Sequence, residues 1–297
     1  MTLTIKAIDP VSRPFFAGEV SGIDITKPLT ADEAAAIERG MDQYGVLVFH
    51  GQHFNDETQL AFSRNFGELE LANGDLNWGQ ARRLESALVN DISNLDNDSR
   101  VMARDDRKRL FGLGNRMWHS DSSFKEVPAK FSLLSARSIP SAGGNTEFAD
   151  MRAAYDDLSA ADKAECENLI CEHSQLYSRA VLGFTDFTEA DRQRFKPVLQ
   201  RLVRRHPSTG RKSLYLASHA GAIIGWPVPE ARAFLRDLVE HATQRKYVYA
   251  HVWKQWDLVM WDNRATMHRA RPFNPNEVRD MHRTTVGCER STMAEAA

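Results

Sequence analysis

Hydrophobic residues in this 297-residue chain fall mostly into short runs separated by turn-forming residues. A run of about four to eight apolar residues between glycine, proline or asparagine is typical of a buried strand. Such runs predict strands at residues 46–49, 87–92, 131–136, 145–149, 199–206, 213–216, 247–253, 257–261 and 282–286. Residues 207–210, Pro-Ser-Thr-Gly, are a hairpin signal between two of these strands.

A helical period of apolar residues occurs in fewer segments. Thr30 and Glu33 have the spacing of a capping box, which predicts a helix from residue 30 to about residue 44. Pro229 suits a first helical position and predicts a helix to about residue 243. The same period predicts helices at residues 55–66, 151–158 and 160–172.

Many short strands, with helices early in the chain and in insertions, predict a mainly β fold with helices. The core is expected to be a β-sandwich or jelly roll decorated by α-helices, since strands and helices do not alternate regularly. No repeat is visible, so residues 1–297 are expected to form a single domain. Residues 70–116 and 174–197 show no clear period, and long irregular segments of this kind are expected to act as lids.

Composition narrows the class of partner and the compartment. With 42% hydrophobic residues, 26% charged residues and a net charge of −2, neither nucleic acid nor a membrane is an expected partner. Cys166, Cys171 and Cys288 lack the spacing of a disulfide framework, which fits a reducing cytoplasm. No secretion signal is visible at the N-terminus, and no apolar run approaches the roughly 18 residues of a membrane span. We therefore expect a cytoplasmic protein.

The candidate chemistry is centred on Trp118-His119-Ser120-Asp121. In an extended segment His119 and Asp121 point to the same side, because side chains alternate along a strand. One such pair is expected by chance in a chain of this composition, so a structural histidine near a strand end is an alternative. His268 offers a second imidazole, and two histidines with one carboxylate are the ligand set of non-haem Fe(II) oxygenases.

Several motifs, taken in order, resemble the Fe(II)- and 2-oxoglutarate-dependent dioxygenases of the taurine dioxygenase family, and most closely its 2,4-dichlorophenoxyacetate dioxygenases. The resemblance extends from about residue 12 to residue 288 and rests on residues 118–124, 143–148, 150–155, 261–264 and 268–269. It implies a double-stranded β-helix, or jelly roll, that holds iron at one end. It also implies that His119, Asp121 and His268 are the metal ligands.

The resemblance implies Fe(II), 2-oxoglutarate as cosubstrate and O2, with ascorbate as a stimulant. Arg279 matches the arginine that binds the distal carboxylate of 2-oxoglutarate, which a guanidinium can hold through two hydrogen bonds. Thr146 matches a hydroxyl donor to that carboxylate. Trp261 matches a position lining the cosubstrate pocket, although a core tryptophan is an alternative.

Arg283 follows Arg279 at a spacing that returns to the same face of a strand, so both can point into one cavity. The family pattern assigns Arg283 to the anionic group of the substrate, while a surface ion pair is the alternative for either arginine. His206, His219 and His251 lie in stretches similar to the herbicide-degrading subgroup, and each either lines the pocket or is structural. Ala222 stands where that subgroup has a further histidine.

The reaction implied by the resemblance is hydroxylation of the ether-adjacent carbon of an aryloxyacetate such as 2,4-dichlorophenoxyacetate. It yields a phenol, glyoxylate, succinate and CO2, a step of aromatic herbicide degradation. The same chemistry on a sulfonate, an alkyl sulfate or another small carboxylate is an alternative, because Arg283 suits any of these anions. A non-catalytic jelly-roll protein that holds a metal is an alternative of another class. The sequence leaves the oligomeric state open, a homo-oligomer included.

Overall fold

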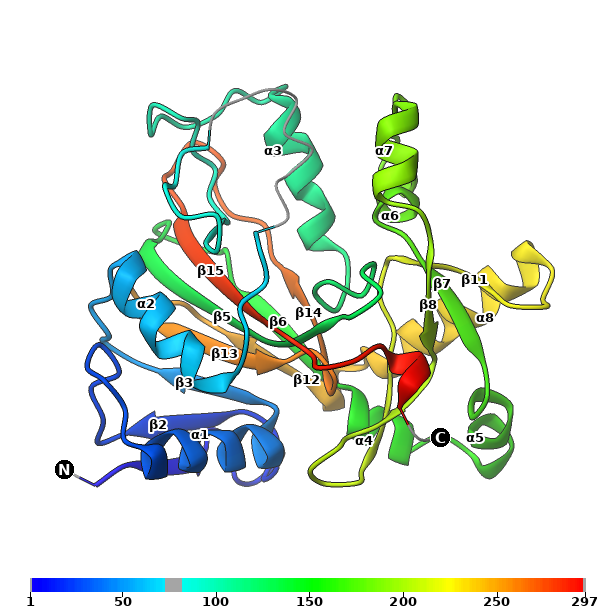
Figure 1. The fold of residues 1–297 in the computed structure, drawn as a ribbon, viewed down its shortest axis with the longest axis horizontal. Coiled ribbons are helices and arrows are strands. Elements are labelled where there is room, and N and C mark those ends of the chain that lie inside the picture. The colour runs from blue at the N-terminus through cyan, green and yellow to red at the C-terminus, as the bar shows by residue number, and fades with distance from the viewer. Residues whose placement is uncertain (1, 73–81, 296–297) are drawn as a thin grey trace.

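The computed structural model describes residues 2–72 and 82–295, and two sheets form the centre of this part of the chain (Figure 1). The larger sheet has seven strands in the order β1-β2-β3-β13-β5-β15-β4. β2 and β3 run parallel, and the other neighbouring pairs are antiparallel. The strands are β1 (Thr4–Ala7), β2 (Gly18–Ser21), β3 (Val46–Phe49), β13 (Leu258–Asp262), β5 (Ala129–Ser138), β15 (Asp280–Gly287) and β4 (Asn90–Asp91).

The smaller sheet packs against the larger one. Its order is β12 (Val248–His251), β6 (Thr146–Asp150) and β14 (Thr266–Ala270). Phe148 of the smaller sheet shares a buried core with Trp261 of the larger sheet. Two facing sheets with mainly antiparallel strands form the jelly roll, or double-stranded β-helix, so the predicted mainly β fold with helices is confirmed.

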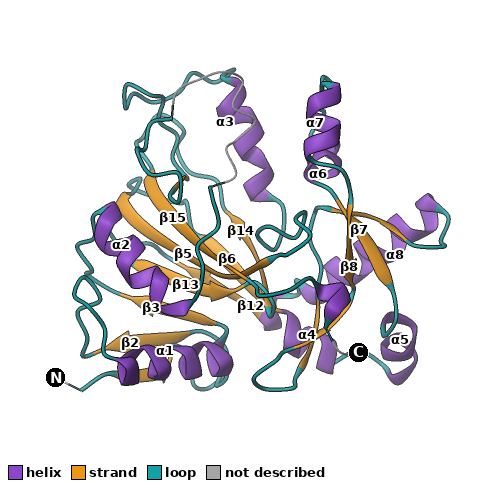
Figure 2. Cartoon of the chain, in the orientation of Figure 1, coloured by secondary structure: helices purple, strands orange, loops and turns teal. Residues whose placement is uncertain are grey.

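Two N-terminal helices cover the outer face of the larger sheet (Figure 2). α1 (Ala31–Tyr44) begins with the predicted capping box, in which the Thr30 side chain accepts a hydrogen bond from the backbone N–H of Glu33. α2 (Asp56–Ser63) follows β3 and continues into a 3-10 turn. Met41 of α1 is fully buried in the core beneath these helices.

A second group of elements lies beside the jelly roll, and most of them, including α4, α5, β7, β11 and α8, share one apolar core. β7, β8 and β11 form a three-stranded sheet, and β9 and β10 form a hairpin. Among the helices of the described residues, none is both long and apolar enough to cross a membrane. In chain order the elements are α4 (Met151–Asp156), α5 (Ala160–Cys166), β7 (Ile170–His173), α6 (Gln175–Val181), α7 (Glu189–Arg194), β8 (Val198–Arg201), β9 (Val203–Arg205), β10 (Lys212–Leu214), β11 (Ala220–Ile223) and α8 (Val228–Ala242).

Some elements differ from the sequence expectation. The helix predicted at residues 160–172 ends at Cys166, and residues 170–173 form β7, because their alternate side chains are more deeply buried. β11 and β14 were not predicted as strands, since the first consists largely of small residues and the second is partly polar. The strand pattern at residues 87–92 is reduced to the short β4.

Residues 82–116 lie at the end of the jelly roll where β15 begins (Figure 1). Their backbone is mostly irregular and carries α3 (Arg107–Gly112) followed by a 3-10 turn. The side chain of Asp106 caps α3 by accepting a hydrogen bond from the backbone N–H of Arg109. Residues 73–81 of the predicted lid lie outside the described residues, and the lid function of residues 70–116 and 174–197 stays a prediction.

Candidate metal centre

His119 and His268 are held side by side by the backbone. The N–H of His119 donates to the carbonyl oxygen of His268 (3.0 Å), and the N–H of His268 donates to the carbonyl oxygen of His119 (2.8 Å). This bridge brings the two imidazole ring centroids to 4.2 Å. The segment is not a regular strand, because Asp121 begins a turn in which Ser122 has a φ of 53°.

The donor atoms of three predicted site residues converge. Nε2 of His119 lies 3.9 Å from Oδ1 of Asp121, and Nε2 of His268 lies 3.7 Å from Oδ2 of Asp121. Within the described residues, this is the one group of three histidine, cysteine or acidic side chains with ligand atoms all within 4.8 Å of one another. Nδ1 of His119 is bonded to the carbonyl oxygen of Met117 at 2.8 Å, which leaves Nε2 as the atom available to a metal.

Burial and neighbouring charges set the protonation of this group. Burial lowers the pKa of both His119 and His268, so both imidazoles are neutral at neutral pH. Burial alone would raise the pKa of Asp121, but the positive charge of Arg283 holds that pKa well below its usual range. The centre therefore offers two neutral nitrogens and one ionised carboxylate.

Asp121 is held through its carboxylate by two strands and through its backbone N–H by a turn. Ser132 of β5 donates to Oδ2 at 2.7 Å, and Arg283 of β15 donates to Oδ1 at 2.5 Å. The backbone N–H of Asp121 donates to the side-chain oxygen of Asn263 at 3.0 Å. Sequence reasoning missed Ser132 and the role of Asn263, because neither residue type in isolation signals a metal site.

Asn263 also fixes the position of Trp261. The indole N–H of Trp261 donates to the Asn263 side-chain oxygen (3.1 Å), and the Asn263 amide donates to Ser132 Oγ (3.0 Å). The Trp261 ring lies 4.6 Å from the ring of His268 and is 1% exposed. Trp261 is thus packed behind His268. It does not line the neighbouring cavity, which agrees with the alternative that it is a core tryptophan.

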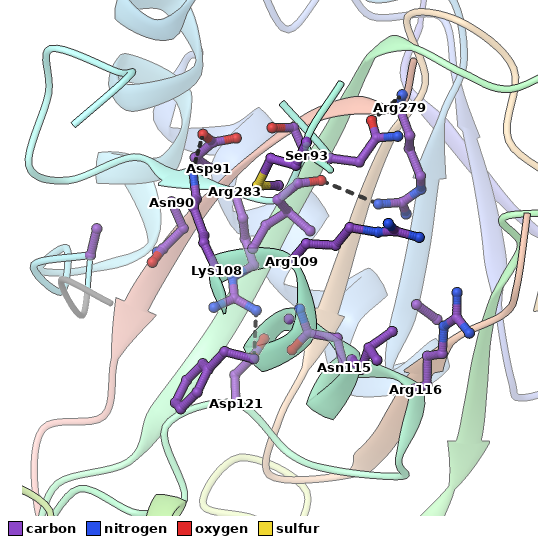
Figure 3. A pocket seen from close by; sticks show the side chains of 18 of the residues that line it. Asn90, Asp91, Ser93, Lys108, Arg109, Asn115, Arg116, Asp121, Arg279 and Arg283 are labelled. Carbon is purple, nitrogen blue, oxygen red and sulfur yellow. Dashed lines mark hydrogen bonds and ion pairs between the residues drawn. The ribbon is translucent and has the colours of Figure 1, made fainter. Parts of the chain in front are cut away.

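A cavity of about 260 Å³ opens beside the three converging side chains. Figure 3 shows side chains from β4, α3 and β15 around it, with Arg279 and Arg283 on the wall and Asp121 at one end. Arg279 and Arg283 therefore line one cavity, although Arg279 precedes β15 and the strand register shifts between Asp280 and Met281, so the two are not on one regular strand as expected. The alternative of surface ion pairs does not describe either arginine, since Arg279 is 6% exposed and Arg283 contacts Asp121.

Arg279 is a buried cation with few polar partners in the described residues. Its Nη1 donates to the carbonyl oxygen of Ile92 at 3.2 Å, and no ion pair to it occurs within residues 2–72 and 82–295. Burial lowers the pKa of Arg279 to about 10, so the guanidinium remains charged at neutral pH. A desolvated cation on a cavity wall is suited to a carboxylate ligand.

Thr146 lies on β6 and is 3% exposed. Its hydroxyl oxygen accepts a hydrogen bond from the indole N–H of Trp253 at 3.0 Å, which leaves the hydroxyl hydrogen available to an acceptor. The adjoining Gly144 turn passes close to Arg279, since a Cβ on Gly144 would lie 3.6 Å from Nε of Arg279. Thr146 itself is not among the cavity-lining side chains.

The three further histidines have different places. His206 is bonded to Asp262 at 3.0 Å and His251 to Asp257 at 3.0 Å, and neither lines the cavity. His219 lines the cavity with its ring 6.1 Å from that of His119, and its Nδ1 is bonded to the hydroxyl of Ser178. His206 and His251 therefore fit the alternative of a structural histidine, and His219 is the one of the three that lines the cavity.

Residues 7–285 match the family described as taurine catabolism dioxygenase TauD, TfdA family. The chain is 46% identical over 273 residues to the alpha-ketoglutarate-dependent 2,4-dichlorophenoxyacetate dioxygenase of Cupriavidus pinatubonensis, covering 92% of this chain and 95% of that one. It is 38% identical over 250 residues to the (S)-phenoxypropionate/alpha-ketoglutarate-dioxygenase of Sphingobium herbicidovorans, covering 82% of each.

The structure is also similar to the crystal structure of AAD-2 in complex with Mn(II) and N-oxalylglycine. The TM-score is 0.90 at 55% identity, and the match covers 98% of this chain and 99% of that chain. A family match over most of the sequence and relatives at this level of identity confirm the resemblance carried by the motifs. The protein belongs to the taurine catabolism dioxygenase TauD, TfdA family.

Proposed function

We propose that this protein is an Fe(II)- and 2-oxoglutarate-dependent dioxygenase that hydroxylates the ether-adjacent carbon of an aryloxyacetate such as 2,4-dichlorophenoxyacetate. The observation that carries the proposal is one buried site in which two imidazoles and a carboxylate converge beside the guanidiniums of Arg279 and Arg283. The named activities of the relatives at 46% and 38% identity support the substrate class.

His119, Asp121 and His268 would hold the iron. Their donor set of two neutral nitrogens and one carboxylate fits Fe(II), and it leaves coordination positions for a cosubstrate and oxygen. Two neutral ligands and one anionic ligand leave a divalent ion with one net positive charge. That residual charge favours a dianionic 2-oxo acid over a neutral ligand.

When bound, Fe(II), 2-oxoglutarate and O2 together supply the oxidising power for C–H hydroxylation, with 2-oxoglutarate leaving as succinate and CO2 and ascorbate keeping the iron reduced. Arg279 would bind the distal carboxylate of 2-oxoglutarate through its guanidinium. Thr146 would donate its free hydroxyl hydrogen to the same carboxylate, because Trp253 already occupies the oxygen as a donor. Trp261 would support this pocket indirectly by holding the ring of His268.

Arg283 would bind the carboxylate of the substrate. Because its guanidinium also contacts Asp121, it can place the carbon next to that carboxylate close to the metal ligands, with the aromatic ring farther away. Hydroxylation of that carbon gives a hemiacetal. The bond from this carbon to the aryl oxygen then breaks, the phenol leaves with the hydroxyl proton, and glyoxylate remains.

The test is aerobic incubation of the purified protein with Fe(II), ascorbate, 2-oxoglutarate and 2,4-dichlorophenoxyacetate. We expect phenol and succinate to form in equal amounts, and the H119A variant to form neither. The sulfonate and alkyl sulfate alternatives are examined in parallel with alkanesulfonates and alkyl sulfates, because an alkylsulfatase of Acinetobacter baylyi is a relative at 28% identity. Coupled turnover of these compounds without phenol release would replace the proposed substrate class. No oxygen-dependent succinate with any compound would favour the non-catalytic binding protein.

We propose further that residues 1–297 act as a single dioxygenase domain and that the enzyme works in the cytoplasm. The motif order and the family match over residues 7–285 support a single domain. The absence of a disulfide pattern among the three cysteines supports the compartment. Fractionation and limited proteolysis test these two points.

A further inference from the structure

More arginine and lysine side chains than acidic side chains line the cavity. Asp91 and Asp121 are the acidic side chains in the described lining, and both are already ion-paired. Asp91 contacts Arg83 at 2.8 Å and Lys108 at 3.1 Å, while Asp121 contacts Arg283. Among the further lining cations, Arg271 is 3.7 Å from Glu147, whereas Arg109, Arg116 and Arg279 have no ion pair within residues 2–72 and 82–295.

Arg109 of α3 is such a cation. It lines the cavity, and its side chain makes no hydrogen bond or ion pair within residues 2–72 and 82–295. Figure 3 shows its side chain extending from α3 toward Arg279, on the side of the cavity away from Asp121. Two guanidiniums that point toward one another repel, and an anion between them removes that repulsion.

The direction of Arg109 follows from how α3 is held. The neighbouring Lys108 pairs with Asp91 of β4, and β4 is paired with β15. Consecutive residues on a helix point about 100° apart, so one side chain can anchor α3 to the sheet while the next faces the cavity. Arg109 is therefore presented by an anchored helix rather than by a free loop end.

We propose that Arg109 is a second guanidinium for the distal carboxylate of 2-oxoglutarate, and that binding of this carboxylate docks α3 against Arg279. This inference rests on the proposed function and adds a binding residue to it. The carboxylate has two oxygens, so it can accept from Arg279 on the wall and from Arg109 on the opposite side. The bound cosubstrate would thus hold the segment that covers it.

The test uses equilibrium binding, which does not depend on turnover. Titration calorimetry of the whole protein with Mn(II) and N-oxalylglycine, a non-reacting analogue of 2-oxoglutarate, gives Kd for the natural sequence and for R109Q, R109K and R104Q. Loss of one charge-assisted hydrogen bond predicts that R109Q raises Kd by roughly tenfold, with R109K in between. R104Q is the matched control, because Arg104 lies in the same segment, is exposed and does not line the cavity.

Hydrogen exchange supplies a second readout that a merely structural arginine would not change. The analogue should slow amide exchange across residues 107–116 in the natural protein, and much less so in R109Q. Turnover should show a higher KM for the cosubstrate, with the KM for the aryloxyacetate unchanged. An unchanged Kd in R109Q, or a rise in the aryloxyacetate KM alone, overturns the inference.

Failure of the inference is distinguishable from failure of the proposed function. If R279Q loses analogue affinity and R109Q does not, the cosubstrate site stands and only the role of Arg109 is wrong. If no variant and no form of the protein binds the analogue with Mn(II), both are wrong.

Discussion

The cavity joins two regions that are built in opposite ways. At one end lies a group that we call the floor: the three candidate ligands, of which His119 and Asp121 line the cavity, with Ser132 and Asn263 behind them. All five are at most 6% exposed and are connected by hydrogen bonds between β5, β13–β14 and the turn at residue 121. The roof of the cavity, residues 82–94 and 107–116, is mostly irregular. It is joined to β15 by the pairing of β4 and by the ion pair of Arg83 with Asp280, while Lys108 joins α3 to Asp91 of β4.

This difference separates two tasks. A metal centre requires donor atoms held within fractions of an ångström, which buried and fully bonded side chains provide. A cover over a substrate cavity must open for exchange. The ion pair that joins α3 to β4, Lys108 with Asp91, has side chains that are 25% and 10% accessible and contributes little to stability. We therefore expect changes in the floor to abolish chemistry and changes in the roof to alter binding while the fold persists.

The largest effect should come from the floor carboxylate. Asp121→Ala removes the one anionic ligand and also leaves Arg283 and Ser132 without their partner. We expect loss of iron retention and of turnover, measured by metal analysis after gel filtration and by succinate formation. Asp98→Ala is the control, since Asp98 is an exposed carboxylate with a 74% accessible side chain and lies outside both the floor and the roof. Iron bound at one equivalent to the Asp121 variant would contradict the assignment.

Substitutions of Arg279 and Arg283 test which ligand each of these two cavity-lining arginines binds. A hydrogen bond to a charged group is worth about 1.5–3 kcal/mol, so Arg279→Gln should raise the cosubstrate KM by roughly 10- to 100-fold. Arg283→Gln should instead raise the aryloxyacetate KM and permit 2-oxoglutarate consumption without phenol formation. Measuring both constants for both variants decides the assignment, because the opposite pattern would mean that the two roles are exchanged.

A substitution of Asn263 tests whether the metal ligands depend on the hydrogen bonds behind them. Asn263→Ala removes the acceptor for the Asp121 N–H and the Trp261 indole, and the donor to Ser132. Unsatisfied buried groups cost about 1–3 kcal/mol, and loss of such support lowers metal affinity by roughly 10- to 100-fold. Denaturant unfolding and competitive metal titration measure the two effects. Asn65→Ala, which changes an amide outside the cavity lining, should leave metal affinity unaltered.

The floor was easier to predict from the sequence than the roof. His119 and Asp121 were found from a short motif with a chemical reason, His268 was a candidate second imidazole, and the family resemblance implied all three as ligands. Ser132 and Asn263 act through a hydrogen-bond network between strands that are distant in sequence, which no local pattern encodes. The roof has no apolar period, so neither α3 nor the direction of Arg109 could be predicted. β14, which carries His268, was missed because strand pairing rather than composition makes it a strand.

A smaller effect on cosubstrate affinity is expected from Trp253, which contacts Thr146. Trp253→Phe keeps an aromatic ring but removes the N–H that donates to Thr146. A neutral hydrogen bond contributes about 0.5–1.5 kcal/mol, so the Kd for N-oxalylglycine should rise by roughly 2- to 10-fold at unchanged kcat. If Trp253 acts through Thr146, the double variant with Thr146→Val should be no weaker than Thr146→Val alone. Additive effects would show that Trp253 acts by another route.

The smallest effect on stability should come from the roof itself. Lys108→Ala breaks the pair with Asp91, whose side chains are 25% and 10% accessible, and should lower the free energy of unfolding by only about 0–1 kcal/mol. Lys27→Ala, which breaks an exposed pair with Asp24 elsewhere, should cost as little. Of the two variants, only Lys108→Ala should reduce the slowing of exchange across residues 107–116 by the bound analogue, because Lys108 lies on α3 and Lys27 does not. Equal exchange in the two variants would mean that α3 is held by its other contacts, among them the ion pair of Arg107 with Asp186.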